Sequence, residues 1–218
     1  MDRPRRSFAF GLRPSRLAVA HREKPDRFVR YLLRAGFIPL PWFLFWSALG
    51  AFFAPGYSSV SQQVSEMSLI SGLPRVFADT AGIGVGAAFI AFAIGLWLDS
   101  NRKIAVGAVA WLVFGAAMVS NGVWHMGSPM HGLYAVGIVN LIAPAMSLIE
   151  SSSTLRNSRD GYIVTAVASI AGVLYLWLNL VGADPHGFEG LTQRLFSSIN
   201  SLWPFVAAAV LLRRAGPT

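Results

Sequence analysis

The chain has 218 residues, of which 54% are hydrophobic and only 13% are charged. A soluble domain usually has about 25% charged residues, so this composition excludes an ordinary soluble domain and is typical of a chain that lies in lipid. The net charge is +8, but ten of the 18 Lys and Arg precede residue 35. That distribution is typical of a segment attracted to anionic lipid, and it argues against nucleic acid as a partner. Because the chain has no cysteine, disulfides, thiolate metal sites and a cysteine nucleophile are excluded.

Residues 1–34 form a basic N-terminal segment that we treat as a region of its own, predicted to be cytoplasmic. Its first 20 residues contain Pro4 and Pro14 and predict disorder. Arg27, Arg30 and Arg34 then recur at helical spacing, with Phe28 between them. A helix here would place its arginines against lipid phosphates. Two alternatives remain, an interfacial helix and a solvated tail.

Six apolar stretches follow, each as long as a membrane span requires. Runs of this length that are rich in Gly and Ala predict membrane helices rather than strands. We therefore predict an all-α, polytopic membrane protein with six transmembrane helices, in one domain over residues 35–214. The predicted spans are residues 36–54, 76–98, 104–124, 132–149, 162–181 and 195–212.

The positive charges predict the orientation of these spans. The N-terminal segment has ten Lys and Arg, and the loops at 99–103 and 151–161 and the C-terminus have two each, which makes 16. The loops between them have only Arg75 and Arg194. Because cytoplasmic loops carry the excess of Lys and Arg, we predict that both termini are cytoplasmic and that the protein is integral to the cell (inner) membrane.

The predicted outer loops hold Glu66, His125, His131, Asp184 and His186, and Asp79 lies about one turn into the second span on the same side. These residues are the polar candidates for a site. Imidazole and carboxylate groups are the ligands of catalytic zinc. However, His125 and His131 lack the i, i+4 spacing of a helical zinc motif, and we predict no metal. A headgroup or small-molecule site and ordinary interfacial polar groups in contact with water are the main alternatives.

Other chemistries have less support. A haem between His125 and His131 would need a slot between helices that a five-residue turn does not offer. The serines carry no G-x-S-x-G motif. No acid or base lies in the middle of a span, where a proton-coupled transporter has one. The sequence therefore identifies no cofactor.

The glycines of residues 82–86 contain a G-x-x-x-G pattern inside the second predicted span. Such a pattern lets two helix backbones approach closely. The face that contains Gly82 and Gly86 is therefore expected to pack against another helix, either within the fold or on a membrane-protein partner.

Four short motifs resemble a known family. They are Pro55-Gly56-Tyr57, Ser65-Glu66-Met67, the histidine His131 at the start of span four, and Gln193-Arg194 at the start of the last span. Together they resemble the bacterial and archaeal membrane family called domain of unknown function 998, over residues 36–214. The layout is also similar to eukaryotic DRAM-like and GPI-remodelling membrane proteins. The resemblance implies the six-span fold and no established activity, and it marks Tyr57, Ser65, Glu66, His131 and Arg194 for testing.

From these observations we expect a membrane protein whose outer edge binds a lipid or amphiphile headgroup or a protein partner. The first alternative is a lipid-modifying hydrolase with His131 and Glu66 as its acid–base pair. The second is a structural subunit of a larger complex. We also expect Arg194 to form an ion pair with Glu66, Asp79 or Glu189.

Overall fold

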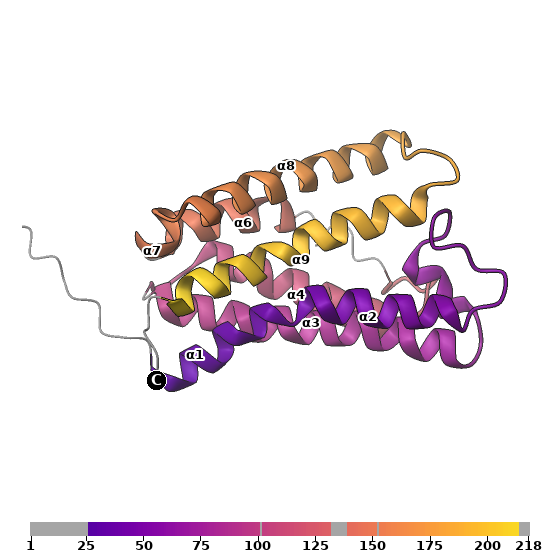
Figure 1. Cartoon of the computed structure of the whole chain (residues 1–218), viewed down its shortest axis with the longest axis horizontal. Helices are drawn as coiled ribbons and strands as arrows, with labels where there is room; N and C mark the ends of the chain where they lie inside the picture. Colours follow the sequence, from indigo (N-terminus) through magenta and orange to yellow (C-terminus); the bar gives the residue numbers. More distant parts are fainter. Residues whose placement is uncertain (1–25, 101, 132–138, 152, 214–218) are drawn as a thin grey trace, which may run out of the picture.

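The computed structural model describes residues 26–100, 102–131, 139–151 and 153–213, and in this part of the chain the regular secondary structure is all helical, with no strand (Figure 1). The helices are α1 (Arg27–Arg34), α2 (Pro39–Phe52), α3 (Leu73–Ser100), α4 (Val106–Val123), α6 (Val139–Glu150), α7 (Ser153–Arg156), α8 (Arg159–Val181) and α9 (Glu189–Arg213). Two short 3-10 helices accompany them, η1 (Ala35–Phe37) and η2 (Val64–Leu69). The predicted all-α fold is confirmed.

Five helices of the described residues are long and apolar enough to cross a membrane. They are Arg27–Phe52, Leu73–Ser100, Val106–Val123, Arg159–Leu178 and Glu189–Arg213, and each contains most of a predicted span. The fourth predicted span, residues 132–149, begins outside the described residues, which include only its second part, α6. The chain is therefore a polytopic membrane protein.

The first span begins earlier than its apolar run. Helices α1 and α2 form one 26-residue unit, joined by the 3-10 turn η1. Gly36 in this turn is buried, and a Cβ there would lie 2.6 Å from the carbonyl oxygen of Pro204 in α9. Leu33 in α1 is also fully buried. The segment with Arg27, Arg30 and Arg34 is thus helical and packs on the bundle through its apolar side.

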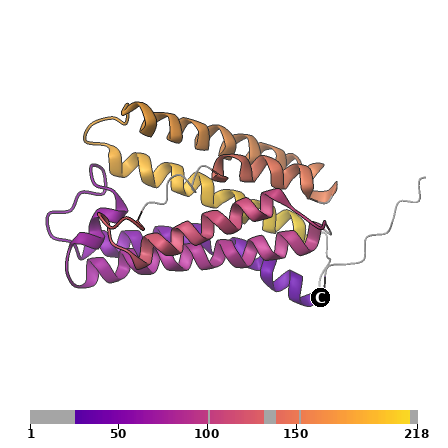
Figure 2. The same ribbon diagram turned by 180° about the vertical axis from the view of Figure 1, so that it is seen from behind.

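The glycines of α3 pack inside the fold. A Cβ on Gly86 would lie 2.5 Å from the carbonyl oxygen of Gly115 in α4, and one on Gly82 would lie 3.1 Å from the backbone nitrogen of Gly122. Helices α3 and α4 lie side by side along their length (Figure 2). Small residues permit this close backbone approach. Of the two predicted alternatives for the face with Gly82 and Gly86, packing within the fold is the one observed, because α4 of the same chain occupies this face.

Aromatic rings fill the centre of the bundle. Phe89 and Phe92 of α3, Trp111 of α4 and Trp203 of α9 are all fully buried. The rings of Trp111 and Trp203 stack with centroids 5.2 Å apart. The indole nitrogen of Trp203 donates a hydrogen bond of 2.9 Å to the hydroxyl of Thr165 in α8. This bond satisfies a buried polar group and connects α9 to α8.

A buried carboxylate fixes the start of α4. The oxygens of Glu150, the last residue of α6, accept hydrogen bonds from the backbone nitrogens of Val106 at 2.9 Å and Gly107 at 2.8 Å. A negatively charged group at this position also interacts favourably with the positive, N-terminal end of the α4 dipole. The contact shows that α6 ends where α4 begins, so the two helices are antiparallel.

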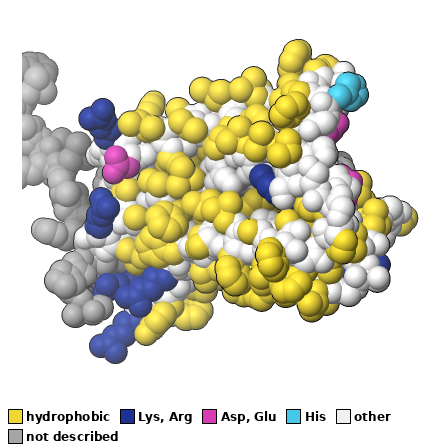
Figure 3. Space-filling view, turned by 45° about the vertical axis from the view of Figure 1, so that its right-hand side comes forward, with side chains coloured by type: hydrophobic (Ala, Val, Ile, Leu, Met, Phe, Trp, Pro, Cys, Tyr) yellow, Lys and Arg dark blue, Asp and Glu magenta, His cyan; other side chains and the backbone are white. Residues whose placement is uncertain are grey.

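The two ends of the bundle differ in chemistry. Most Lys and Arg side chains gather at the end where α1 begins and α9 ends, and hydrophobic side chains cover the middle (Figure 3). At the opposite end lie residues 53–72, 124–131 and 182–188, which join or follow the helices. The described parts of all three predicted outer loops therefore share one end of the molecule.

Candidate functional site

Hydrogen bonds tie the three loops of this end together. The backbone nitrogen of Leu191 donates to the carbonyl of Val60 at 2.8 Å, and that of Val64 donates to the side-chain oxygen of Gln193 at 2.7 Å. The backbone nitrogen of Met126 donates to the hydroxyl of Ser68 at 3.3 Å. The segment at residues 53–72 thus contacts both other loops and organises this end of the bundle.

Arg194 in the first turns of α9 joins that helix to the same segment. Its guanidinium donates hydrogen bonds to the carbonyl oxygens of Ser59 at 2.8 Å, Gln62 at 2.9 Å and Gly190 at 3.0 Å. It also donates a hydrogen bond to the hydroxyl of Tyr57. Hydrogen bonds from a charged donor are stronger than neutral ones. Through these contacts Arg194 joins the start of α9 to the loop that follows α2.

The expected ion pair of Arg194 was a wrong prediction. Its guanidinium donates to three backbone carbonyls and one phenol, and none of its hydrogen bonds goes to Glu66, Asp79 or Glu189. The physical reason is the turn at residues 58–62, which directs two carbonyl oxygens toward the start of α9.

Tyr57 completes this contact from the other side. Its hydroxyl lies 2.9 Å from the carbonyl oxygens of both Gln62 and Gln63, and its ring centroid is 5.6 Å from the guanidinium carbon of Arg194. Burial raises the pKa of the Tyr57 phenol above 10.0, against a smaller opposing effect of Arg194. The phenol is therefore neutral and acts as a donor to the loop while it accepts from Arg194.

Glu66 has a structural contact in the same group of residues. One carboxylate oxygen accepts from the backbone nitrogen of Gln63 at 2.8 Å, and the other lies 3.3 Å from the side-chain nitrogen of Gln62. This is the capping box of the short helix η2. We call Tyr57, Gln62, Gln63, Glu66 and Arg194 the Arg194 cluster.

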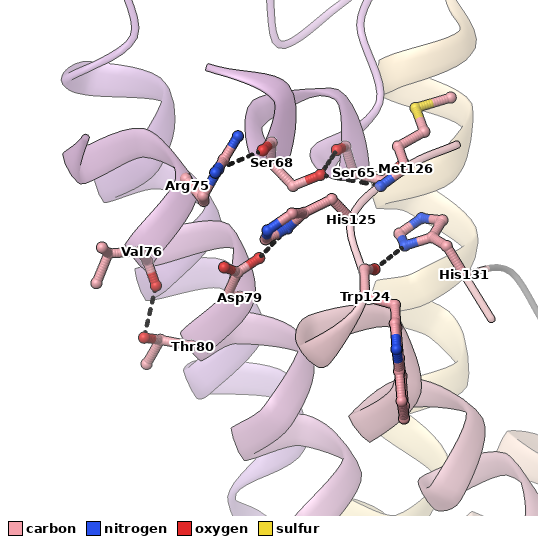
Figure 4. A network of polar contacts seen from close by, with 10 residues as sticks. All are labelled: Ser65, Ser68, Arg75, Val76, Asp79, Thr80, Trp124, His125, Met126 and His131. Carbon is pink, nitrogen blue, oxygen red and sulfur yellow. Dashed lines mark hydrogen bonds and ion pairs between the residues drawn. The ribbon is translucent and has the colours of Figure 1, made fainter. Parts of the chain in front are cut away.

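A second group lies where α3 begins and α4 ends. Asp79 and His125 point toward each other there (Figure 4). The Oδ1 atom of Asp79 and the Nδ1 atom of His125 are 3.8 Å apart, which is too long for a hydrogen bond. Both atoms are buried, and neither has a hydrogen-bond partner among the described residues. The two side chains are therefore close to each other, but neither facing atom makes a hydrogen bond to a described residue.

Arg75 lies one turn before Asp79 on α3. Its Nε donates a hydrogen bond of 2.8 Å to the carbonyl oxygen of Ser68. The Ser68 hydroxyl in turn donates to the carbonyl of Ser65 at 2.6 Å. Ser65 thus contributes a backbone oxygen, and its hydroxyl takes no part in these bonds. We call Arg75, Asp79 and His125 the Asp79 site.

Among the described residues, His131 makes no hydrogen bond or ion pair with Asp79. Its Nδ1 is 2.7 Å from the carbonyl oxygen of Trp124, so that nitrogen carries a proton and donates it to this bond. The bond closes the turn after α4. The predicted acid–base candidates His131 and Glu66 take part in different hydrogen-bond networks, and no hydrogen bond among the described residues joins them.

The third loop contributes an exposed pair. The Nδ1 atom of His186 lies 3.8 Å from a carboxylate oxygen of Glu189, and the imidazole is fully exposed. Asp184 has a buried carboxylate oxygen without a hydrogen-bond partner in the described part of the chain. Among the described residues, no hydrogen bond or ion pair joins Asp184 or His186 to the Asp79 site or the Arg194 cluster.

A metal would need several ligands together. Among the described residues there is no group of three or more His, Cys, Asp or Glu side chains that could hold a metal ion. The pair of Asp79 and His125 provides two such side chains, with a guanidinium beside them, so its chemistry suits hydrogen-bonding and ionic ligands.

Several residues that contribute to these contacts were not predicted from the sequence. Arg75 was noted only as a charge for orientation, Ser68 carried no motif, and Glu150 was assigned to no site. The local signal was the G-x-x-Q-R run that begins at Gly190. A Cβ on Gly190 would lie 2.1 Å from the carbonyl oxygen of Gln62, so this glycine permits the contact that Arg194 secures.

The comparisons with known proteins identify a family only. No curated protein matches the chain, and no solved structure matches it. Residues 37–210 match a family model described as protein of unknown function (DUF998). This match extends over most of the chain and confirms the resemblance drawn from the short motifs, so the chain belongs to the DUF998 family.

Proposed function

We propose that this integral membrane protein binds the polar headgroup of an amphiphile at the Asp79 site. The observation that carries the proposal is the unsatisfied pair of Asp79 and His125, whose facing atoms are buried and 3.8 Å apart. A buried polar atom without a partner costs free energy, and these two atoms are buried although 40% of the His125 side chain and 22% of the Asp79 side chain are exposed. Such a cost is expected where a ligand supplies the missing hydrogen bonds.

The surroundings of the pair suit a ligand with a hydrocarbon chain. Val76 of α3 and Val123 of α4 are exposed large hydrophobic residues near the two helix ends, and Ile83, seven residues after Val76, is also exposed. In a membrane these side chains face acyl chains. An amphiphile lying against them would place its polar end beside Asp79.

The Arg194 cluster and the Asp79 site have different roles at this end of the bundle. Arg194 already donates to three carbonyls and the Tyr57 hydroxyl, so we assign the Arg194 cluster to structure. Arg75 uses only its Nε for Ser68, which leaves its two terminal nitrogens for a ligand. The proposal therefore moves the binding role from the motif residues Tyr57, Ser65, Glu66 and Arg194 to the Asp79 site.

The hydrolase alternative has less support from the geometry. An acid–base pair must reach the same reacting group, yet His131 bonds to Trp124 while Glu66 caps η2. Ser68 is an unsuitable nucleophile, because its hydroxyl already donates to Ser65 and accepts from Met126.

Native mass spectrometry of the protein released from its own membrane tests the proposal. We expect a discrete amphiphile adduct on the wild-type protein. Asp79→Leu and His125→Ala should each reduce the adduct at least tenfold, since each removes one half of the pair. His186→Ala is the matched control, because this imidazole is fully exposed and should leave the adduct unchanged. Equal adducts on all four proteins would overturn the proposal.

A further inference from the structure

The order of charges along α3 narrows the class of ligand, an inference that rests on the proposed function. Arg75 and Asp79 are four residues apart in one helix, so they share a face and lie about 6 Å apart along the axis. Helix α3 begins at the end that holds the outer loops. The guanidinium therefore lies nearer the surface, and the carboxylate lies deeper.

This order of Arg75 and Asp79 disfavours the common two-chain phospholipids. Between their acyl chains and the phosphate they have ester oxygens, which only accept hydrogen bonds and would face the oxygens of Asp79. An ethanolamine ammonium lies beyond the phosphate, farther from the chains, and would meet Arg75 rather than Asp79. The first arrangement brings two sets of hydrogen-bond acceptors together, and the second brings two positive charges together.

The complementary ligand has a hydrogen-bond donor between its chain and its phosphate. We propose that the Asp79 site binds a single-chain glycerophosphate with a free hydroxyl at the central glycerol carbon, that is, a lysophospholipid. The hydroxyl donates to the carboxylate of Asp79, and the phosphate accepts from the terminal nitrogens of Arg75, whose hydrogen bond to Ser68 uses only the Nε atom. His125 lies beside the carboxylate (Figure 4) and donates or accepts with its other ring nitrogen.

The depth of the site also fits one chain. The exposed side chains of Val76 and Ile83 recur on one face of α3, at a spacing of seven residues. Residues at this spacing form one stripe along a helix. An acyl chain attached just below the hydroxyl would follow this stripe toward the middle of the membrane.

Binding of four probes to the purified protein in detergent tests the inference. They are 1-oleoyl-glycerol 3-phosphate, its 2-O-methyl ether, oleyl phosphate and glycerol 3-phosphate. The first should bind at least tenfold more tightly than the second and third, which lack the donor. Glycerol 3-phosphate, which lacks the chain, should not compete at equal concentration, and this separates a lipid from a free phosphate ester.

Two variants test the contact to the hydroxyl and the contact to the phosphate separately. Asp79→Leu should make the three chain-bearing probes bind alike, because the acceptor for the hydroxyl is gone. Arg75→Gln should weaken all three while it keeps their order. Asp184→Asn is the control, since Asp184 lies in the third loop and outside the site.

The outcomes separate this inference from the proposed function. If the wild-type protein binds the three chain-bearing probes equally and Arg75→Gln weakens them, the headgroup site stands and the hydroxyl requirement is wrong. If none of the four binds, and native mass spectrometry finds no adduct, both proposals are wrong. The comparison of probes uses the wild-type protein, so it decides the matter even if a variant does not fold.

Discussion

The guanidinium of Arg194 donates a hydrogen bond to the hydroxyl of Tyr57 and lies 5.6 Å from the centroid of its ring. These residues are 137 positions apart in the chain. Their contact joins the loop after the first span to the start of the last, so the two ends of the transmembrane region are fastened at the end of the bundle that carries the Asp79 site.

Replacement of Arg194 should therefore destabilise the fold. Arg194→Ala leaves the carbonyls of Ser59 and Gln62 without their donor, and we expect a loss of about 2–3 kcal/mol, as for hydrogen bonds of a charged group. Arg194→Lys should recover only part of it, because an ammonium lacks the planar fork. Thermal unfolding in detergent measures both. A transition of Arg194→Ala at the wild-type temperature would contradict the structural role.

Tyr57 predicts a dependence of stability on alkaline pH. Because burial raises the pKa of its phenol above 10.0, the unfolded state loses this proton first. The contribution of the neutral phenol is therefore complete below pH 10.0 and decreases as the pH rises through the higher pKa of the folded protein. Tyr57→Phe should lose less stability than the wild type between pH 9 and pH 11. Parallel losses in the two proteins would show that another group controls the change.

The Glu150 carboxylate should matter at the other end of the bundle. Glu150→Ala removes the acceptor of the Val106 and Gly107 backbone nitrogens. We expect a loss of about 1–2 kcal/mol, similar to that of a lost helix N-cap. Glu150→Gln keeps one acceptor, so its loss should be smaller. Equal stability of Glu150→Ala and the wild type in thermal unfolding would refute this assignment.

The orientation of the bundle remains a prediction from charge. Cysteines introduced as Ser59→Cys and His186→Cys should react with a membrane-impermeant thiol reagent in intact cells, and Lys103→Cys should react only after the cells are opened. The chain has no cysteine of its own, so no background labelling from it is expected. Labelling of Lys103→Cys in intact cells, with none at Ser59→Cys, would reverse the orientation.

The helices could be predicted because their signal is local. An apolar run such as residues 76–98 needs no partner to be recognised, and α3 (Leu73–Ser100) contains all of it. The shared end of the loops followed from the charges, which alternate along the chain.

The contacts of the site could not be predicted, because they join residues far apart. Arg194 was expected to find a carboxylate, yet the turn at residues 58–62 offers backbone oxygens closer to it. Asp79 and His125 meet because Gly122 lets α4 approach α3, where a Cβ would lie 2.6 Å from the carbonyl oxygen of Asp79. Neither contact can be predicted from the spacing of residues in the sequence.

The central claim is that an amphiphile lies beside Asp79, and photo-crosslinking in living cells tests it most directly. A benzoyl-phenylalanine at Val76 would lie one turn from Asp79, and Val173 on α8 offers a control position with nearly the same exposure, 55% against 53%. We predict one dominant lipid adduct at position 76 that is lost in Asp79→Leu, and only the bulk phospholipids at position 173. The same mixture of adducts at both positions, unchanged by Asp79→Leu, would contradict the account.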